Sequence, residues 1–365
     1  MKVLIINTVP TEKNGITNVI FNYLSATEEK DIIFDYISLN DPDKVYKEAI
    51  RRVGGTICVL KRSSKNIFSY ISSLQKFIEE NGYDIVHIHG NSHTVVLELI
   101  AAKKAGCRVR IVHAHSTKCN SLTVHKFLTP LFNHYYTHGI ACGKEAGYFM
   151  FGKKPFSVMN NGIDTHKFAF NPQNRIENRK ILGWENCKII GHVGYFTALK
   201  NQSFIVDIFE CLFKQNSNYR LILIGDGPMR GEIQNKLDSK GLGKMACLTG
   251  NIDNVNEYIN AIDTIVMPSL FEGLPLTLIE QQANGLPCVV ADTITREADK
   301  TGNLQFLSLK APVEEWTLAV LHEDGVSREA RSKKAIEDIT AEGYNIKYQA
   351  KKLSSFYYDT LANNY

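Results

Sequence analysis

Short runs rich in β-branched and aromatic residues alternate with longer helical patterns along the whole chain. "KVLIINT", "DIVHIHG" and "VRIVHAH" are such runs in the first half, and "KIIGHVG" and "RLILIGDG" are such runs in the second. Between two of them, Ile67, Ile71, Leu74 and Ile78 recur at helical spacing, and Gly82 ends that pattern. This alternation predicts βαβ units and therefore an α/β fold with parallel sheets covered by helices.

One polar stretch, residues 160–180, interrupts this alternation. It has turn chemistry at Asn161-Gly162 and Asn171-Pro172 and lacks an apolar period, so we interpret it as a linker. Since 365 residues exceed one ordinary core, the sequence predicts two Rossmann-like domains, residues 1–168 and 169–345, with parallel sheets facing across a cleft. Such sheets bind ligands at the carboxyl ends of their strands, where we expect the functional site.

The composition is that of an ordinary soluble protein, with 44% hydrophobic and 22% charged residues. The start "MKVLIINTV" suits a first strand better than a signal peptide, and no run approaches 18 apolar residues. The eight cysteines are scattered without a C-x-x-C pattern, which is typical of reduced thiols. We therefore expect a cytoplasmic protein.

Charge is distributed unevenly between the halves. Residues 1–168 hold 21 Lys and Arg against 14 Asp and Glu, a net charge of +7, whereas residues 169–365 have 21 against 24, or −3. A basic first domain could contact a phosphate-bearing acceptor or an anionic membrane surface. A solvated basic surface is an equally good explanation of the same pattern.

Two glutamates stand eight positions apart in "FEGLPLTLIEQQANGLP", Glu272 in a Gly-Pro loop and Glu280 on the helix that follows. The preceding strand "DTIVMPS" places this loop at the carboxyl end of a sheet. Free amides at a helix start favour anions and hydroxyl oxygens, so Gly273, Leu274 and Leu276 can donate to a ligand. Glu280 can accept bonds from hydroxyls farther along. The spacing suits a sugar at one end and a ribose at the other.

The stretch "EGLPLTLIE" resembles the E-x7-E signature of the family 4 glycosyltransferases, which have GT-B architecture. Further stretches agree in order over nearly the whole chain, including "KNGITNVIFNYL", "ACGKEAGYFMFG", "NNGIDTHKF", "HVGYFTALKNQ" and "LILIGDGP". The chain most resembles the bacterial branch that builds exopolysaccharide or capsule repeat units. In this family the last helix, here about residues 346–365, crosses back to the first domain.

The resemblance implies roles for single residues. Glu280 would hold the ribose hydroxyls of a nucleotide sugar, and Glu272 would face the donor sugar and its phosphates. Lys200 would pair with the diphosphate as its negative charge grows, and His115 would lie near the donor sugar and the acceptor. The implied catalytic residues are His115, Lys200 and Glu272, and the implied nucleotide-sugar-binding residues are Gly15, Gly194, Tyr195, Lys200, Glu272, Gly273, Leu274, Leu276 and Glu280.

The sequence departs from the family pattern at two places. Tyr195 stands where the family usually has an arginine that helps to neutralise the diphosphate, and a phenol offers one neutral donor where arginine offers five charged ones. Either Lys200 and the helix starts suffice, or another cation enters, or the enzyme is weakened or inactive. Asn14 replaces the first glycine of the pair that often precedes the first helix, and Gly15 is retained.

Two H-x-H pairs, His87/His89 and His113/His115, stand at strand ends. Residues two apart on a strand face the same side, so each pair could be part of a metal ligand set. No Asp, Glu or Cys accompanies them at ligand-like spacing, and the family that the chain resembles is metal-independent. We expect no metal and no cofactor, and we interpret all but His115 as structural.

The resemblance implies retaining transfer of a sugar, with a UDP-hexose as the favoured donor, to a hydroxyl of an undecaprenyl-diphosphate-linked oligosaccharide in exopolysaccharide or capsule biosynthesis. It also implies a cytoplasmic location, free or peripheral on the inner face of the plasma membrane, and no nucleic-acid partner. Two alternatives remain open. A GT-B nucleotide-sugar epimerase would need acid-base carboxylates in the cleft, and a non-catalytic nucleotide-sugar-binding protein would be consistent with Tyr195.

Overall fold

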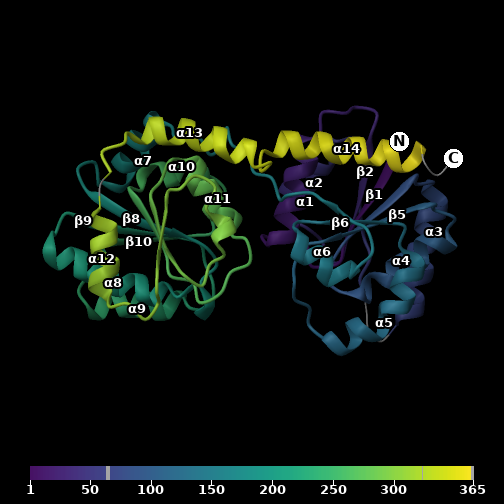
Figure 1. The fold of residues 1–365 in the computed structure, drawn as a ribbon, viewed down its shortest axis with the longest axis horizontal. Coiled ribbons are helices and arrows are strands. Elements are labelled where there is room, and N and C mark those ends of the chain that lie inside the picture. Colours follow the sequence, from purple (N-terminus) through teal and green to yellow (C-terminus); the bar gives the residue numbers. More distant parts are fainter. Residues whose placement is uncertain (63–65, 323, 363–365) are drawn as a thin grey trace. The chain divides into compact units, whose positions relative to one another are not determined.

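The computed structural model describes residues 1–62, 66–322 and 324–362, and the chain forms two compact units (Figure 1). Unit 1 comprises Met1–Gly162 and Gly343–Tyr365, and unit 2 comprises Ile163–Glu342. The sequence places the same divisions after residues 168 and 345. In the structure the first division falls at Gly162, where a Cβ would lie 2.7 Å from the Ile346 Cα. The returning chain therefore packs directly on this glycine.

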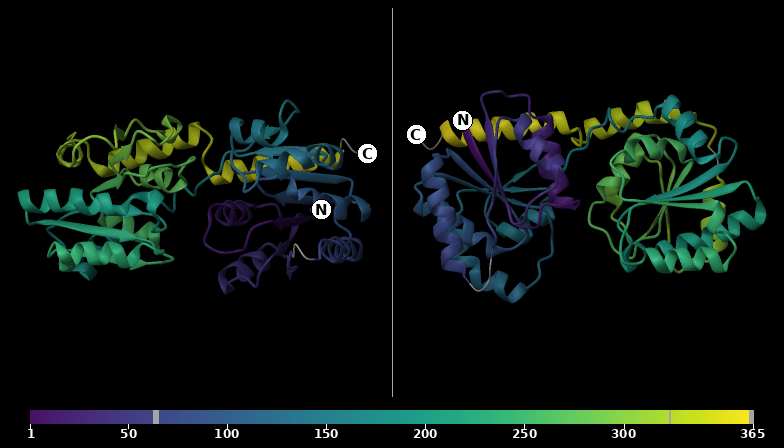
Figure 2. Two further views of the ribbon diagram at one scale, coloured as in Figure 1. Left: turned by 90° about the horizontal axis from the view of Figure 1, so that it is seen from below. Right: turned by 180° about the vertical axis from the view of Figure 1, so that it is seen from behind.

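Unit 1 is built, in the residues described, on a sheet of seven parallel strands in the order β3-β2-β1-β4-β5-β6-β7. Helices cover both faces of the sheet (Figure 2). The strands are β1 (Lys2–Asn7), β2 (Ile33–Ser38), β3 (Ile57–Val59), β4 (Ile85–His89), β5 (Val109–Ala114), β6 (His138–Ala141) and β7 (Ser157–Val158). The helices are α1 (Gly15–Ala26), α2 (Lys44–Arg52), α3 (Ile67–Asn81), α4 (Val96–Lys104), α5 (Leu122–Tyr135), α6 (Lys144–Phe151) and α14 (Ile346–Ala362).

Unit 2 repeats this arrangement with six parallel strands, in the order β10-β9-β8-β11-β12-β13 over its described residues. The strands are β8 (Lys188–Val193), β9 (Tyr219–Ile224), β10 (Ala246–Gly250), β11 (Thr264–Met267), β12 (Cys288–Ala291) and β13 (Leu304–Leu307). The helices are α7 (Pro172–Leu182), α8 (Gln202–Gln215), α9 (Arg230–Ser239), α10 (Val255–Tyr258), α11 (Leu276–Ala283), α12 (Val313–Leu321) and α13 (Arg328–Ala341).

The expectation of an α/β fold with two parallel sheets is confirmed. The central strands are buried on both faces, as continuous runs such as "VLII" at Val3–Ile6 require when helices cover both sides. In each unit the strand order reverses once, between β1 and β4 and between β8 and β11. Open α/β sheets bind ligands at the carboxyl ends of strands at such a reversal.

The helix α7 corrects the interpretation of residues 160–180 as a linker. Asn171 accepts hydrogen bonds from the amides of Gln173 and Asn174, and Pro172 occupies the first helical position. The face that α7 buries carries Asn178 and Arg179, which are 6% and 7% exposed, instead of apolar side chains. The sequence pattern therefore lacked an apolar period although residues 172–180 form a helix.

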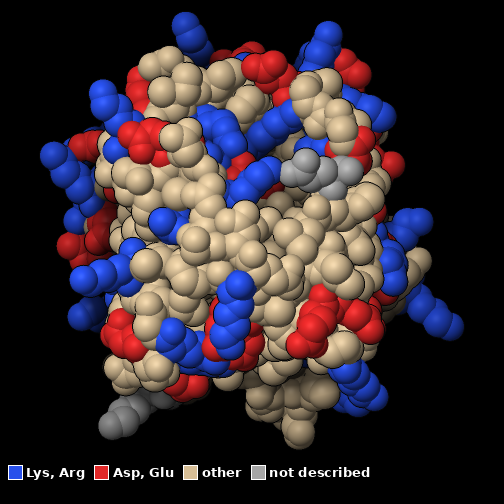
Figure 3. Space-filling model, turned by 90° about the vertical axis from the view of Figure 1, so that its left-hand side faces the viewer, with Lys and Arg blue, Asp and Glu red and all other residues tan. Residues whose placement is uncertain are grey.

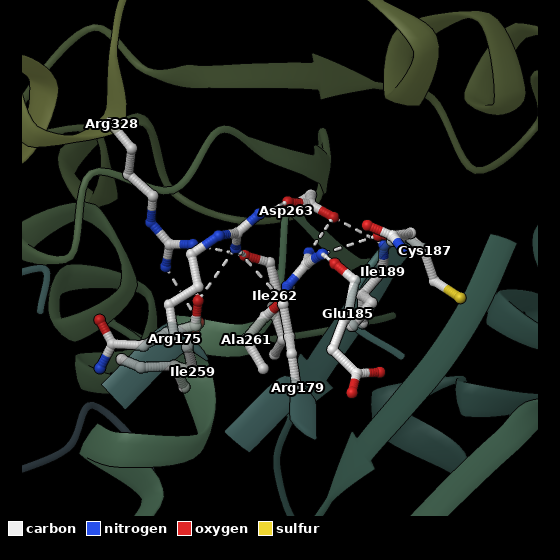
Figure 4. Close-up of polar contacts among 12 residues, drawn as sticks. Arg175, Arg179, Glu185, Cys187, Ile189, Ile259, Ala261, Ile262, Asp263 and Arg328 are labelled. Carbon is white, nitrogen blue, oxygen red and sulfur yellow. Dashed lines mark hydrogen bonds and ion pairs between the residues drawn. The ribbon is translucent and has the colours of Figure 1, made fainter. Parts of the chain in front are cut away.

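Arginines from α7 and α13 bind residues 259–263, the segment that leads into β11 (Figure 4). Arg175 and Arg179 pair with Asp263 at 2.5 and 2.6 Å, and Arg328 from α13 donates to the carbonyl groups of Ile259 and Asn260. Burial acts to raise the pKa of Asp263, but the two guanidinium groups outweigh burial and lower it. The Asp263 carboxylate therefore stays ionised in the folded protein.

The last helix, α14, belongs to unit 1 and packs on α1. Its Tyr357 is fully buried, and the hydroxyl lies 2.6 Å from His87 Nδ1 on β4. None of the helices in the described part of the chain has both the length and the apolar character needed to cross a bilayer.

Candidate active site

Two loops meet at the carboxyl ends of β8 and β11 in unit 2, where the strand order reverses. The Leu270 amide donates to the Leu199 carbonyl at 2.8 Å, and Asn201 Nδ2 donates to the Pro268 carbonyl at 3.2 Å. Asn201 has φ of 54°, a left-handed conformation that turns the chain into α8. These contacts fix the two loops side by side.

Lys200 and Glu272 come from these two loops and form an ion pair of 2.5 Å. Their side chains are 21% and 12% exposed, so the pair is sheltered but accessible. Without a ligand, the positive charge of Lys200 is thus balanced by Glu272. A diphosphate would have to draw the ammonium group from the carboxylate or share it.

The start of α11 follows Glu272 and presents main-chain amides. The helix begins at Leu276, and Pro275 in the N-cap position supplies no side-chain hydrogen bond. Gly273 is exposed, with no atom within 4 Å of the place where a Cβ would lie, while Leu274 is half-buried. The free amides and the helix dipole make this a suitable place for an anion.

Glu280 lies one turn into α11. Burial raises the pKa of its carboxyl to about 8, and Lys167 opposes that shift. Its accessible surface is intermediate, although the carboxyl is surrounded by enough protein to lose most of its hydration. Within the described residues no hydrogen bond to this carboxyl is recorded. A ribose with two hydroxyl donors would supply the missing partners and favour the ionised form.

Gly194 and Tyr195 begin the loop after β8. A Cβ on Gly225, whose φ is +134°, would lie 2.1 Å from the Gly194 carbonyl oxygen, so this contact requires glycine at 225. A Cβ on Gly194 would lie 3.0 Å from His192 Nε2 and 3.6 Å from Lys200 Cε. Tyr195 is 60% exposed, and its carbonyl accepts from Gln202 Nε2 at 3.2 Å.

His192 is a neighbour of this site that the sequence analysis missed. It is fully buried at the end of β8, Nδ1 lies 3.0 Å from the Val266 carbonyl oxygen, and Nε2 has no partner among the described residues. Burial, together with the nearby charge of Lys200, lowers its pKa to about 3. His192 is therefore neutral beside Lys200. The available signal was a polar side chain in the otherwise apolar strand "KIIGHV".

Gly15 is the first residue of α1 in unit 1 and follows the loop after β1. Asn14 caps this helix, since its Oδ1 accepts from the Thr17 amide at 3.0 Å and its Nδ2 donates to the Pro10 carbonyl at 2.9 Å. No atom lies within 4 Å of a Cβ built on Gly15. The Asn14 that replaces the usual glycine thus has a local structural role.

His115 follows β5 in unit 1. Its Nε2 lies 2.9 Å from His89 Nδ1, and its amide donates to Asn91 Oδ1 at 2.9 Å. Burial lowers its pKa to about 3, so the ring is neutral at physiological pH. A neutral imidazole can orient a hydroxyl or a water but supplies no positive charge. The structure thus brings together Lys200 and Glu272 in unit 2, and in unit 1 it places Gly15 at the start of α1 and His115 directly after β5.

A cavity of about 490 Å³ lies at the amino ends of the unit 2 strands. This is the end of the sheet opposite to the Lys200 and Glu272 loops. In the face shown in Figure 3, Lys and Arg side chains are interspersed with Asp and Glu side chains, mostly around the rim. Three of the lining residues are Arg175, Arg328 and Arg331, but their guanidinium groups already donate to main-chain carbonyls, Asp263 and Asp324. The size of this cavity alone therefore does not make it the nucleotide site.

The fold of the two parallel sheets is similar to that of solved structures, among them glycosyltransferases of GT-B fold. HepE of Anabaena in complex with UDP has a TM-score of 0.78 and 16% identity over 98% of this chain and 99% of its own. A glycosyltransferase of Rickettsia africae ESF-5 has a TM-score of 0.78 and 15% identity over 99% of both chains. At these identities the likeness concerns the fold.

Sequence comparisons identify the family. The model "Glycosyltransferase Family 4" matches residues 13–167, and "Glycosyl transferases group 1" matches residues 174–299. EpsF of Bacillus subtilis (strain 168), which is named as a glycosyltransferase, is 31% identical over 337 residues, 87% of each chain. The Escherichia coli UDP-Gal:alpha-D-GlcNAc-diphosphoundecaprenol alpha-1,3-galactosyltransferase is 32% identical over 253 residues, 65% of each. This chain belongs to the family 4 glycosyltransferases, as its motifs indicated.

Proposed function

We propose that this enzyme transfers a hexose, with retention of configuration, from a UDP-hexose to a hydroxyl of an undecaprenyl-diphosphate-linked oligosaccharide in exopolysaccharide or capsule assembly. The observation that carries the proposal is the Lys200–Glu272 pair beside the open start of α11. The names of two relatives support the substrates: HepE was solved with UDP-glucose, and the E. coli relative is named for UDP-Gal and diphosphoundecaprenol.

In this proposal the donor diphosphate displaces Glu272 from Lys200. The ammonium group and the amides of Gly273, Leu274 and Leu276 then face the phosphate oxygens, and Glu272 turns to the sugar hydroxyls. These charged and dipolar groups favour the transition state because the diphosphate gains negative charge as the glycosidic bond breaks. No metal is needed in this step.

The proposed transfer takes place on one face of the sugar. The bond from the anomeric carbon to the diphosphate oxygen breaks, a bond to the acceptor oxygen forms, and the acceptor proton moves to the departing diphosphate. Because Glu280 is assigned to the ribose, we assign no second carboxylate of the described residues to the paired arrangement of retaining hydrolases. His115 is neutral, and its proposed role is to orient the acceptor or the donor sugar.

An exposed apolar face on α5 supports contact with a membrane that carries the acceptor. Leu122, Val124, Phe127 and Leu131 are 44–80% exposed, and Lys126 beside them is also exposed. Apolar side chains with adjacent lysines are typical of helices that bind anionic lipid surfaces. We propose that unit 1 meets the inner face of the plasma membrane through α5.

The nucleotide can be identified with a thermal-shift panel of UDP, GDP, ADP and their hexose conjugates, since a specific donor stabilises the protein by mass action. Transfer is then measured with the stabilising donor and an undecaprenyl-diphosphate-linked acceptor, and NMR of the product gives its anomeric configuration. Conversion of the donor to an epimer without an acceptor would instead show the epimerase. Donor binding without transfer to any lipid-linked acceptor would show a non-catalytic binding protein.

A further inference from the structure

Four histidines at the ends of β4 and β5 form a cluster in the core of unit 1. His89 and His113 are direct neighbours across the two strands, and His87 and His115 lie two residues away on the same face. The ring centroids of contacting pairs are 4.3–5.5 Å apart. His87, His89 and His113 are at most 4% exposed, so water does not solvate these rings.

Several ring nitrogens of this cluster have no partner in the described part of the chain. These are His87 Nε2, both nitrogens of His113, and His115 Nδ1. The sequence pattern alone indicates a structural role for His87, His89 and His113, but a structural histidine normally satisfies its buried nitrogens. An unpaired buried polar atom costs about 1–3 kcal/mol. Four unpaired ring nitrogens in one cluster need an explanation. A bound ion is one of the recognised explanations for such atoms.

The geometry fits a cation. His87, His89 and His113 each offer a nitrogen, and these nitrogens lie within 4.8 Å of one another. Tetrahedral Zn²⁺ with Zn–N of about 2.0–2.1 Å holds its ligands roughly 3.4 Å apart, so modest rotation of the stacked rings would close the set. A cavity of about 10 Å³ lies against the same three side chains, together with Tyr23 and Tyr357.

In two of the rings, those of His87 and His89, Nδ1 already has a hydrogen-bonding partner. Tyr357 of α14 lies 2.6 Å from His87 Nδ1, and His115 Nε2 lies 2.9 Å from His89 Nδ1. If the Nδ1–H group of each ring donates in these contacts, the Nε2 lone pairs are available as ligands. Metal-binding histidines characteristically have such an orienting partner on the far nitrogen.

We propose that His87, His89 and His113 bind one divalent transition-metal ion, with Zn²⁺ as the best match, in the core of unit 1. Three imidazoles suit Zn²⁺, Co²⁺ and Ni²⁺ better than Mg²⁺ or Ca²⁺, which prefer oxygen ligands. The ion links the ends of β4 and β5 to α14 through Tyr357 and stabilises unit 1. The ion contacts none of the groups assigned to the diphosphate, which lie in unit 2, and it adjoins His115 only through His89.

Zn²⁺ binding to chelator-treated, untagged full-length protein tests this proposal. We expect one Zn²⁺ per chain by calorimetry, a rise in Tm, and at least a tenfold loss of affinity in His113→Gln. The exposed His134→Gln is the matched control and should bind as wild type does. Tyr357→Phe should weaken binding about tenfold, as expected for an orienting partner.

Failure of wild type to bind equimolar Zn²⁺ would overturn the proposal, and so would unchanged affinity in a folded His113→Gln. If that variant does not fold, Co²⁺ bound to wild type decides instead. Visible d–d bands of a four-coordinate Co²⁺ site with imidazole ligands support the proposal, and their absence at saturating Co²⁺ overturns it. UDP binding in unit 2 is measured on the same samples, so failure of the metal site is distinguishable from failure of the proposed function.

Discussion

Lys200 is paired with Glu272 in the absence of substrate. This pairing determines the effect that we expect from a mutation of Lys200 on activity. Loss of Lys200 removes the assigned cation and leaves the Glu272 carboxylate facing the diphosphate. We expect Lys200→Ala to lose more than tenfold in kcat/KM, or about 1.4 kcal/mol of transition-state stabilisation. Initial transfer rates check this, with the exposed Lys214→Ala on α8 as the control. Retention of more than about a tenth of wild-type activity would contradict the role.

Tyr195 is the residue at which the sequence and the family disagree most. Its 60% exposure means that no packed shell is shaped around the phenol, so an arginine can be accommodated without a clash. We expect Tyr195→Arg to bind UDP several-fold more tightly, because a guanidinium can make two charged hydrogen bonds to phosphate. Calorimetric titration of UDP checks this, with Tyr195→Phe expected to resemble wild type. Weaker binding by the arginine variant would show that position 195 does not face the diphosphate.

Glu280 links donor binding to pH. Its carboxyl has a pKa of about 8 in the free protein, and ribose hydroxyls favour the ionised form, so binding releases a proton. UDP affinity should therefore rise with pH up to about 8 in wild type. Glu280→Gln should bind more weakly at pH 8, and its affinity should change less with pH. Titrations from pH 6 to 8.5 check this, and parallel pH profiles of the two proteins would remove Glu280 from the ribose site.

The raised pKa of Glu280 also means that ionising its carboxyl destabilises the ligand-free protein. Its pKa is raised from 4.5, so the native state binds more protons than the unfolded state between pH 4.5 and about 8, and stability falls with rising pH in that window. We expect Glu280→Gln to have a higher Tm than wild type at pH 8 and a smaller difference at pH 5. Thermal melts at both pH values check this. An equal Tm difference at both would show that the carboxyl is not protonated in the fold.

At the scale of the elements, α7 is held by charged contacts. Asp263→Asn would leave Arg175 and Arg179 without their carboxylate. Breaking a fully buried pair from one side costs about 3–5 kcal/mol of unfolding free energy, and we expect a smaller loss here, above about 1 kcal/mol, because the Asp263 side chain is 24% exposed. Urea unfolding checks this. Asp338→Asn, which removes an exposed pair with Lys334 within α13, should cost less than about 0.5 kcal/mol. Similar losses in both variants would mean that the arginines are held by main-chain carbonyls alone.

The strands could be predicted from the sequence because both faces of each sheet are covered, which forces continuous apolar runs. The helix α7 could not, because the side chains that it buries are Arg179 and Asn178 and their partners lie some 80 residues away. Glu272 and Lys200 could be assigned through their motifs, whereas their mutual contact depends on loops 70 residues apart. His192 was missed because a single polar residue in a strand is usually structural.

At the scale of the whole molecule, the groups that we propose to contact the diphosphate most directly, Lys200 and the start of α11, lie in unit 2. We expect UDP to slow hydrogen exchange most strongly in peptides covering residues 194–201 and 270–280, because the amides there would contact the diphosphate. Exchange measured by mass spectrometry with and without UDP checks this, with peptides of α3 as an internal reference. Protection confined to unit 1 would contradict the assignment of the donor site.

The division of unit 1 into two stretches of sequence has a consequence for synthesis. A ribosome releases the whole of unit 2 before it releases α14, whose Tyr357 fills the core of unit 1 against Phe34 and His87. A nascent chain that ends at Glu342 therefore contains every residue of unit 2 but lacks helix α14 of unit 1. The first unit to be translated is therefore the last to be completed.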